Sequence, residues 1–187
     1  NYSPQYAGAV SLFVNDITRV SNYKNDIIVF GNTESKKKLS KNYINLDLNK
    51  KIFQSTSKIY VESFLNIQKK INPDLIEVHN RPNYIRYIKK DFNNKIFLFF
   101  HNDPLTMNGS KTKNERIYLL NNLDKIIFNS RWSQDRFFID LKDNKNLLQK
   151  TSICYQSSSR TKINFEKKKK VISFVGKLNK AKGYDIF

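Results

Sequence analysis

The feature that most constrains the fold is a regular alternation of short apolar runs with longer segments of helical spacing. Runs of β-branched, aromatic and leucine residues predict strands. They lie at residues 26–31, 43–48, 75–79, 95–101, 125–129 and 151–155. Helical periodicity is found between them, at residues 9–21, 55–71, 81–90, 112–122 and 131–141. A chain in which strands and helices alternate is expected to form an α/β domain with a doubly wound, mainly parallel sheet.

The charge is large and positive. The chain of 187 residues has a formal net charge of +18. Such a charge suits a polyanionic partner, which is a nucleic acid, an anionic membrane surface or a phosphorylated substrate. The lysines are nevertheless spread through every predicted element, and only residues 36–38 and 167–170 form runs. We therefore attribute most of the charge to ordinary solvated surface in a chain rich in Lys, Asn and Ile.

The content of cysteine and histidine excludes several classes of protein. The single cysteine, Cys154, excludes an internal disulfide and fits a reducing compartment, and its apolar segment predicts that it packs in the core. Two histidines and one cysteine are too few for a usual zinc site, so we predict no metal. The sequence contains no run of about 18 apolar residues, the length that a membrane-spanning helix needs. We expect a cytoplasmic protein whose first strand is missing, because the chain opens in loop-like residues without a signal-peptide pattern.

Polar side chains follow three of the predicted strands at their carboxyl ends. Such ends meet at one edge of a parallel sheet, and open α/β sheets bind ligands at this edge. The loop that leads into the first predicted helix, at Gly8, belongs to the same edge. The residues predicted to lie on the substrate or acceptor side are Gly8, His79, Asn80, Asn102, Ser130 and Arg131.

His101 is the predicted catalytic residue. It follows the most hydrophobic strand, which we expect at the centre of the sheet, and it precedes a long polar loop. A neutral or protonated imidazole there can donate a hydrogen bond to a sugar hydroxyl or a phosphate oxygen. His79 lies at the same edge, although the adjacent turn at Arg81 and Pro82 also suits a structural role for it.

The helix predicted at residues 131–141 begins with a tryptophan. Ser130 is expected to cap this helix. Trp132 is expected to pack against its own strand, and the alternative is a contact with an acceptor or a membrane surface.

The closing stretch predicts the start of a second domain. An apolar run at residues 171–175 predicts a buried strand, and Gly176, Lys177 and Lys182 follow it in a polar turn. A helix start with lysines nearby suits a phosphate group. The polar stretch before it, with its serine and lysine runs, predicts a linker. The predicted organisation is a domain at residues 1–156, a linker at 157–170 and a truncated second domain at 171–187.

In this order, these motifs resemble glycosyltransferases of family 4, the group 1 glycosyltransferases of GT-B fold. In that family a strand ends in Gly-Arg and a Lys-Gly follows a short loop. Here Gly176-Lys177 and Lys182-Gly183 stand at that spacing, with lysine in place of the usual arginine, which keeps the charge and loses the bidentate fork. Residues 6–9, 74–79, 97–101 and 124–133 are similar to the family's glycine loop, its D-x-x-x-x-H strand, its strand ending in the donor-contacting histidine and its D-x-(apolar)-x-x-S-x-x-(S/T) segment.

The resemblance implies a Rossmann-like GT-B N-terminal domain followed by the first strand of the C-terminal domain. It implies a hexosyl-type transferase that moves a sugar from a nucleotide-diphospho-sugar to a glycan, lipid-linked or small-molecule acceptor, as in lipopolysaccharide or glycan biosynthesis. Gly176, Lys177 and Lys182 would bind the donor diphosphate, and no cofactor or metal is implied. The partners expected are the donor and the acceptor, with peripheral contact to an anionic inner membrane face. The fragment is expected to be inactive alone.

Two other functions remain as alternatives. A basic nucleic-acid-binding α/β protein is suggested by the charge alone, without a recognisable nucleic-acid module. A dinucleotide-dependent oxidoreductase is allowed by the fold class, but no G-x-G-x-x-G follows any predicted strand, and it therefore ranks last.

Overall fold

The chain divides into two compact units, Asn1–Gln156 and Ser157–Phe187. The computed structural model describes residues 1–48, 54–141, 147–157, 180, 183, 185 and 186. The strand predicted at residues 171–175 lies outside the described residues, as do Gly176, Lys177 and Lys182. The fold given below is that of the first unit.

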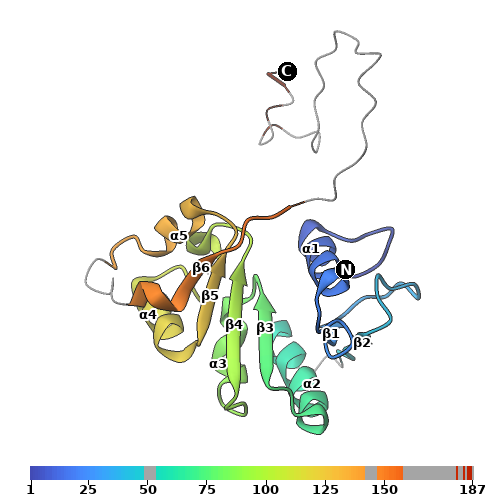
Figure 1. Cartoon of the computed structure of the whole chain (residues 1–187). Coiled ribbons are helices and arrows are strands. Elements are labelled where there is room, and N and C mark those ends of the chain that lie inside the picture. The colour runs from blue at the N-terminus through green and yellow to red at the C-terminus, as the bar shows by residue number, and fades with distance from the viewer. Residues whose placement is uncertain (49–53, 142–146, 158–179, 181–182, 184, 187) are drawn as a thin grey trace. The chain divides into compact units, whose positions relative to one another are not determined.

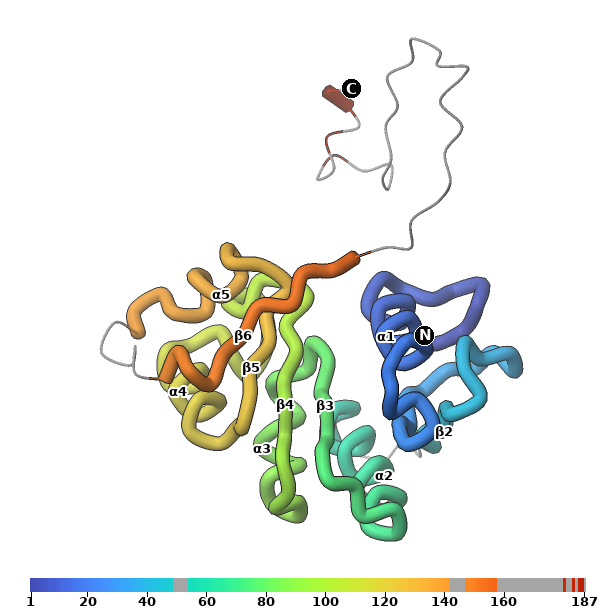
Figure 2. Tube along the Cα trace, viewed as in Figure 1, coloured from blue at the N-terminus to red at the C-terminus, as the bar shows by residue number. Residues whose placement is uncertain are grey.

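The first unit is built on a parallel sheet of four strands. In chain order these are β3 (Leu75–His79), β4 (Lys95–Phe100), β5 (Lys125–Phe128) and β6 (Thr151–Ile153). They also lie side by side in this order, and every pair is parallel (Figures 1 and 2). The prediction of an α/β fold with a mainly parallel sheet is therefore confirmed, and the fold is Rossmann-like. The most hydrophobic strand, β4, has a neighbour on each side.

The two earlier strands form a sheet of their own. β1 (Val29–Gly31) pairs in parallel with β2 (Tyr43–Asn45). Among the described residues no strand pairs with both β1 and β3, so there are two sheets where the alternation of elements suggested one.

Three of the helices begin at residues whose side chains accept hydrogen bonds from the first backbone N–H groups. Ser55 and Ser130 accept hydrogen bonds from Lys58 N and Ser133 N, and Thr112 forms a capping box with Glu115. Such caps provide partners for N–H groups that the helix leaves free. The helices are α1 (Ala9–Val20), α2 (Thr56–Ile71), α3 (Ile85–Ile88, after the 3₁₀ turn η1, Pro82–Tyr84), α4 (Lys113–Asn122) and α5 (Arg131–Phe137); a second 3₁₀ turn, η2, spans Pro104–Thr106.

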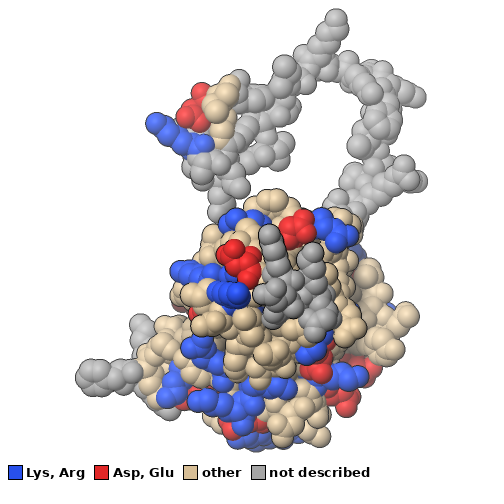
Figure 3. Space-filling model, turned by 90° about the vertical axis from the view of Figure 1, so that its left-hand side faces the viewer, with Lys and Arg blue, Asp and Glu red and all other residues tan. Residues whose placement is uncertain are grey.

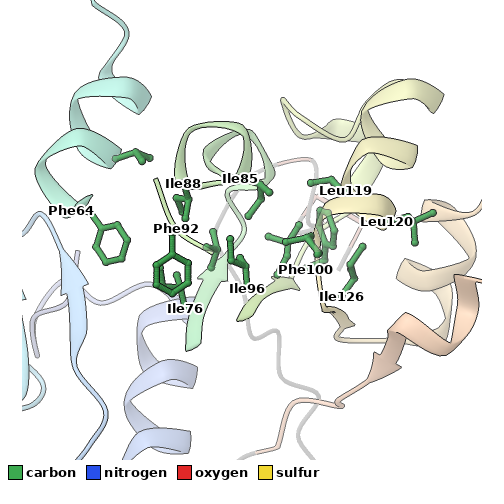
Figure 4. Close-up of a cluster of buried hydrophobic side chains, with 14 of the residues drawn as sticks. Phe64, Ile76, Ile85, Ile88, Phe92, Ile96, Phe100, Leu119, Leu120 and Ile126 are labelled. Carbon is green, nitrogen blue, oxygen red and sulfur yellow. The ribbon is translucent and has the colours of Figure 1, made fainter. Parts of the chain in front are cut away.

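The main core lies between one face of the four-stranded sheet and helices α2 to α5. Alternate strand residues point to this face because side chains alternate along a strand, and Ile96, Leu98 and Phe100 of β4 are fully buried there. Figure 4 shows side chains of α2, α3 and α4 packed over these strands. From α5, Phe137 packs on Phe100 with ring centroids 5.7 Å apart.

On the opposite face of the sheet, α1 packs against the carboxyl end of β4. Phe99 points to this face, is 3% exposed and meets Phe13 of α1 with ring centroids 5.0 Å apart. Helices therefore lie on both faces, as a doubly wound sheet requires. Helix α2 also contacts the smaller sheet, because Phe64 packs on Phe30 of β1 at 5.0 Å.

The loop after β4 has one position that only glycine fits. Gly109 has φ +96°, and a Cβ added there would lie 2.5 Å from the backbone N of Asn83. We expect Gly109→Ala to lower the free energy of unfolding by more than about 1 kcal/mol, because the backbone conformation is strained for an L side chain. Urea unfolding of the 187-residue chain measures the change.

Gly8→Ala is the matched control. Gly8 has φ −80° and no atom lies within 4 Å of an added Cβ. Its small loss as a helix cap is offset by the lower entropy of the unfolded chain. Equal effects of the two substitutions would contradict the close approach at Gly109.

Candidate functional site

The parallel register brings the two histidines of the chain together. His79 is the last residue of β3 and lies opposite Phe99 of β4, so His101, two residues beyond Phe99, projects from the same face. His79 Nδ1 lies 2.9 Å from His101 Nε2. The site at this edge is therefore a hydrogen-bonded histidine pair rather than two separate imidazoles.

The side chain of Gln156 determines which ring nitrogens carry protons. Its amide Nε2 lies 2.9 Å from His101 Nδ1, and an amide nitrogen can only donate. His101 Nδ1 therefore accepts, which leaves the proton of this neutral ring on Nε2, where it is donated to His79 Nδ1. His79 then carries its proton on Nε2, which lies 3.5 Å from Glu77 Oε1.

Both imidazoles are held neutral by their surroundings. Burial lowers the pKa of His79 to about 3, with a smaller effect from His101, and burial lowers the pKa of His101 to about 4. His101 is only 8% exposed. At neutral pH the two imidazoles therefore share a hydrogen bond while both are uncharged.

Aromatic rings provide the apolar surroundings. Phe99 stacks on His101 with centroids 4.4 Å apart and an interplanar angle of 12°. Phe13, from α1, meets His101 edge-on at 5.0 Å and His79 at 6.3 Å. Because these rings exclude water from the pair, they explain why the charged forms of both histidines are disfavoured.

Two asparagines fix the backbone of His101. Asn80 Oδ1 accepts from the backbone N of His101 at 2.8 Å, and Asn129 Nδ2 donates to its carbonyl O at 2.9 Å. Asn80 has φ +54°, a conformation that asparagine tolerates better than most residues. Asn80, predicted on the acceptor side, thus has a positioning role that joins β3 to β4.

The other predicted residues at this edge have local partners. Ser130 caps α5 as predicted, accepting from Ser133 N at 3.1 Å. The carbonyl of Asn102 accepts from Ser133 Oγ at 3.3 Å, which ties the loop after β4 to the start of α5. Arg131 is exposed and donates to Gln134 Oε1 at 3.0 Å.

Gly8 lies at the N-cap of α1 and is exposed. The structure connects it to the histidine pair only through α1, whose Phe13 contacts both rings. No described contact places Gly8 itself against the pair.

Sequence reasoning missed three residues of the site. Glu77 is two positions before His79 on a strand, and this spacing alone could have placed it on the same face. Phe13 belongs to the predicted apolar face of the first helix, but its contact with the histidines depends on how that helix packs. The sequence does not distinguish Gln156 as a site residue, because it stands at the start of a polar stretch.

Two predictions of burial are wrong. Trp132 is 58% exposed because the buried residues of α5 are Ser133, Gln134 and Phe137, which leaves position 132 outside the packed face. Cys154 is exposed because β6 ends at Ile153, one residue before it.

The described part of the chain contains no group of three or more His, Cys, Asp or Glu residues that could hold a metal ion. Among the same residues, no helix is long and apolar enough to cross a membrane. A scan against protein-family models gives no match, and no curated protein matches the sequence. The function proposed below therefore depends on the fold, the site and the sequence motifs.

The chain has two histidines, so histidine titration reports on this pair alone. We expect the imidazole NMR signals to stay constant from pH 8 down to about pH 5 and to shift only near pH 4 and 3, the pKa values of His101 and His79. Protonation near pH 6.5, the ordinary histidine value, would contradict the buried pair.

The same shifts predict a loss of stability in acid. Both folded pKa values lie below the unfolded value of 6.5. As the pH falls from 6.5 towards 4, the unfolded chain takes up protons that the folded chain does not, so the free energy of unfolding decreases. A variant with both histidines changed to glutamine is expected to lose this part of the pH dependence in urea unfolding.

Proposed function

We propose that Asn1–Gln156 is the acceptor-side domain of a glycosyltransferase that uses a nucleotide-diphospho-sugar donor, and that the residues after it begin the donor-binding domain. The observation that carries the proposal is the neutral histidine pair at the carboxyl edge of the parallel sheet, where open α/β sheets bind ligands. The glycosyltransferase-like motifs around both histidines and at Gly176 to Gly183 support the same conclusion.

His101 Nδ1 is the atom of the pair that a substrate can use. His101 Nε2 is already hydrogen-bonded to His79. In contrast, His101 Nδ1 contacts only the side chain of Gln156, an exposed residue at the end of the unit. A sugar hydroxyl donates a hydrogen bond as an amide does, so it can replace Gln156. With a pKa of about 4, the ring stays neutral near pH 7 and accepts this bond.

His79 then acts as a positioning residue. It accepts from His101 Nε2, which keeps the free lone pair of His101 on Nδ1. From the sequence alone, His101 was expected to donate to a sugar hydroxyl or a phosphate oxygen. In the tautomer inferred from these contacts, His101 Nδ1 would instead accept from an acceptor hydroxyl, and a fully ionised phosphate oxygen would not be a partner for it.

On the donor side, the proposal assigns Gly176, Lys177 and Lys182 to the diphosphate. The leaving group is a nucleoside diphosphate, and two ammonium groups would offset the negative charge that develops on it. Gly176, without a side chain, would let the backbone approach a phosphate.

The test uses the full-length protein with a panel of nucleotide-diphospho-sugars and release of nucleoside diphosphate as the readout. We expect His101→Ala to lower kcat/KM for transfer about a hundredfold, the usual effect of a positioned proton acceptor. We expect Lys177→Ala and Lys182→Ala to weaken donor binding. Lys95→Ala, at the exposed amino end of β4, is the charge-matched control.

Unchanged donor affinity in both lysine variants would overturn the diphosphate assignment. Failure of the wild-type protein to bind or turn over any donor in the panel would overturn the transferase proposal.

A second candidate is a nucleic-acid binder. A cavity of about 290 Å³ is lined by Arg86, Lys89 and Lys90 together with Asn93, Tyr118 and Asn122, and has no acidic residue in its lining. Arg86 makes a long ion-pair contact, with 4.0 Å between its Nη2 and Glu115 Oε1. Against this candidate, the face shown in Figure 3 carries Lys and Arg side chains with Asp and Glu among them rather than a single basic stripe.

Salt titration of DNA binding separates the two functions. Three phosphate contacts at this cavity would give a log–log salt slope of about −3, since each contributes about 0.9. From the transferase proposal we expect a slope near zero, measured by fluorescence anisotropy of a labelled duplex. A steep slope that disappears when Arg86, Lys89 and Lys90 are changed to glutamine would favour the nucleic-acid binder.

A further inference from the structure

The only tryptophan of the chain is exposed at the same edge of the sheet as the histidine pair. Trp132 is 58% exposed. It is the second residue of α5, directly after the carboxyl end of β5. The start of α5 is fastened to the loop after His101, because Ser133 Oγ donates to the carbonyl of Asn102 at 3.3 Å.

The indole is held in place by an ion pair. The guanidinium carbon of Arg136 lies over the Trp132 ring, 5.7 Å from its centroid. Arg136 in turn donates from Nη2 and Nε to Asp103 Oδ2, at 2.9 and 3.2 Å. A cation–π contact with a fixed guanidinium restricts the ring, and more than half of the Trp132 residue stays exposed.

The ion pair is itself partly open to solvent. The side chains of Arg136 and Asp103 are 35% and 19% exposed. Asp103 is two residues beyond His101 and joins β4 to η2. An aromatic ring, a carboxylate and a guanidinium thus stand together at the carboxyl edge of the sheet, the edge to which the histidine pair also belongs.

We infer that Trp132, Arg136 and Asp103 form a platform for a pyranose ring of the acceptor. A pyranose has a flat C–H face that stacks on an aromatic ring and a rim of hydroxyl groups that both donate and accept hydrogen bonds. The indole matches the first, and the carboxylate and guanidinium match the second. This inference rests on the proposed transferase function and names the chemistry of its acceptor.

The surroundings favour a sugar over a membrane. Tryptophan and arginine also occur at bilayer surfaces, but here the carboxylate of Asp103 is part of the cluster and exposed Asp135 lies on the same helix. Together these acids offset the charges of Arg136 and exposed Arg131, so the cluster has no net positive charge to attract anionic lipids. An uncharged sugar needs no such attraction.

The test exploits the single tryptophan, whose fluorescence reports on this platform alone. The 187-residue chain is titrated with the methyl glycosides of glucose, galactose, mannose and N-acetylglucosamine. Sorbitol, which has hydroxyl groups but no ring face, is the solute control, and phosphatidylglycerol vesicles are the lipid probe. We expect a saturable change in emission with at least one glycoside and none with sorbitol.

Variants test the role of the ion pair. Arg136→Gln keeps the fluorescent reporter and removes the cation over the ring, so we expect the dissociation constant of the glycoside to rise about fivefold. Arg19→Gln changes an exposed arginine of α1, with 66% of its side chain accessible, and is expected to leave the titration as it is.

The outcomes separate this inference from the proposed function. No response to any glycoside, or a response to vesicles only, would overturn the platform. In the whole protein, Trp132→Ala is expected to raise KM for the acceptor roughly tenfold without changing donor hydrolysis in the absence of acceptor. Normal donor hydrolysis with an unchanged acceptor KM overturns the platform and leaves the transferase standing, whereas absence of donor turnover in the wild type overturns the transferase itself.

Discussion

The parallel hydrogen-bond ladder through β3, β4, β5 and β6 is the constraint on which the rest of the structure depends. Parallel strands end at the same edge, so the polar residues that follow them are brought together without being close in sequence. Burial of β4 on both faces adds a second effect, since Phe100 enters the main core and Phe99 meets α1. Strand β4 therefore positions His101 among apolar side chains, and the burial there lowers its pKa.

The same edge has two parts of different character. Around the histidines, aromatic rings exclude water and both imidazoles are neutral. Around the start of α5, an exposed indole stands beside an ion pair. The proposed sugar transfer draws on both, because a hydroxyl would meet a neutral acceptor atom while the rest of the sugar ring is held. Gln156, the last residue of the first unit, contacts His101 Nδ1, the nitrogen that the proposal assigns to an acceptor hydroxyl.

Most secondary structure could be predicted from the sequence because its signals are local. Apolar runs located β3 at its observed bounds and the other strands to within a few residues, and Ser130 identified the start of α5. The histidines could be found as well, since each follows an apolar run. Burial at the strand and helix ends was less predictable. Trp132 and Cys154 are exposed because a change of one position turns a side chain away from the packed face.

By itself the sequence determined that strands and helices alternate, that their carboxyl ends are polar, and that the only two histidines follow two neighbouring strands. Only the tertiary structure decided that these histidines share one hydrogen bond, that Gln156 sets their tautomers and that Phe13 covers them. The physical reason is range. Periodicity is fixed by residues a few positions apart. The proton positions at this site depend on side chains separated by 22 and 55 positions along the chain, and the low pKa values come mainly from burial in the folded structure.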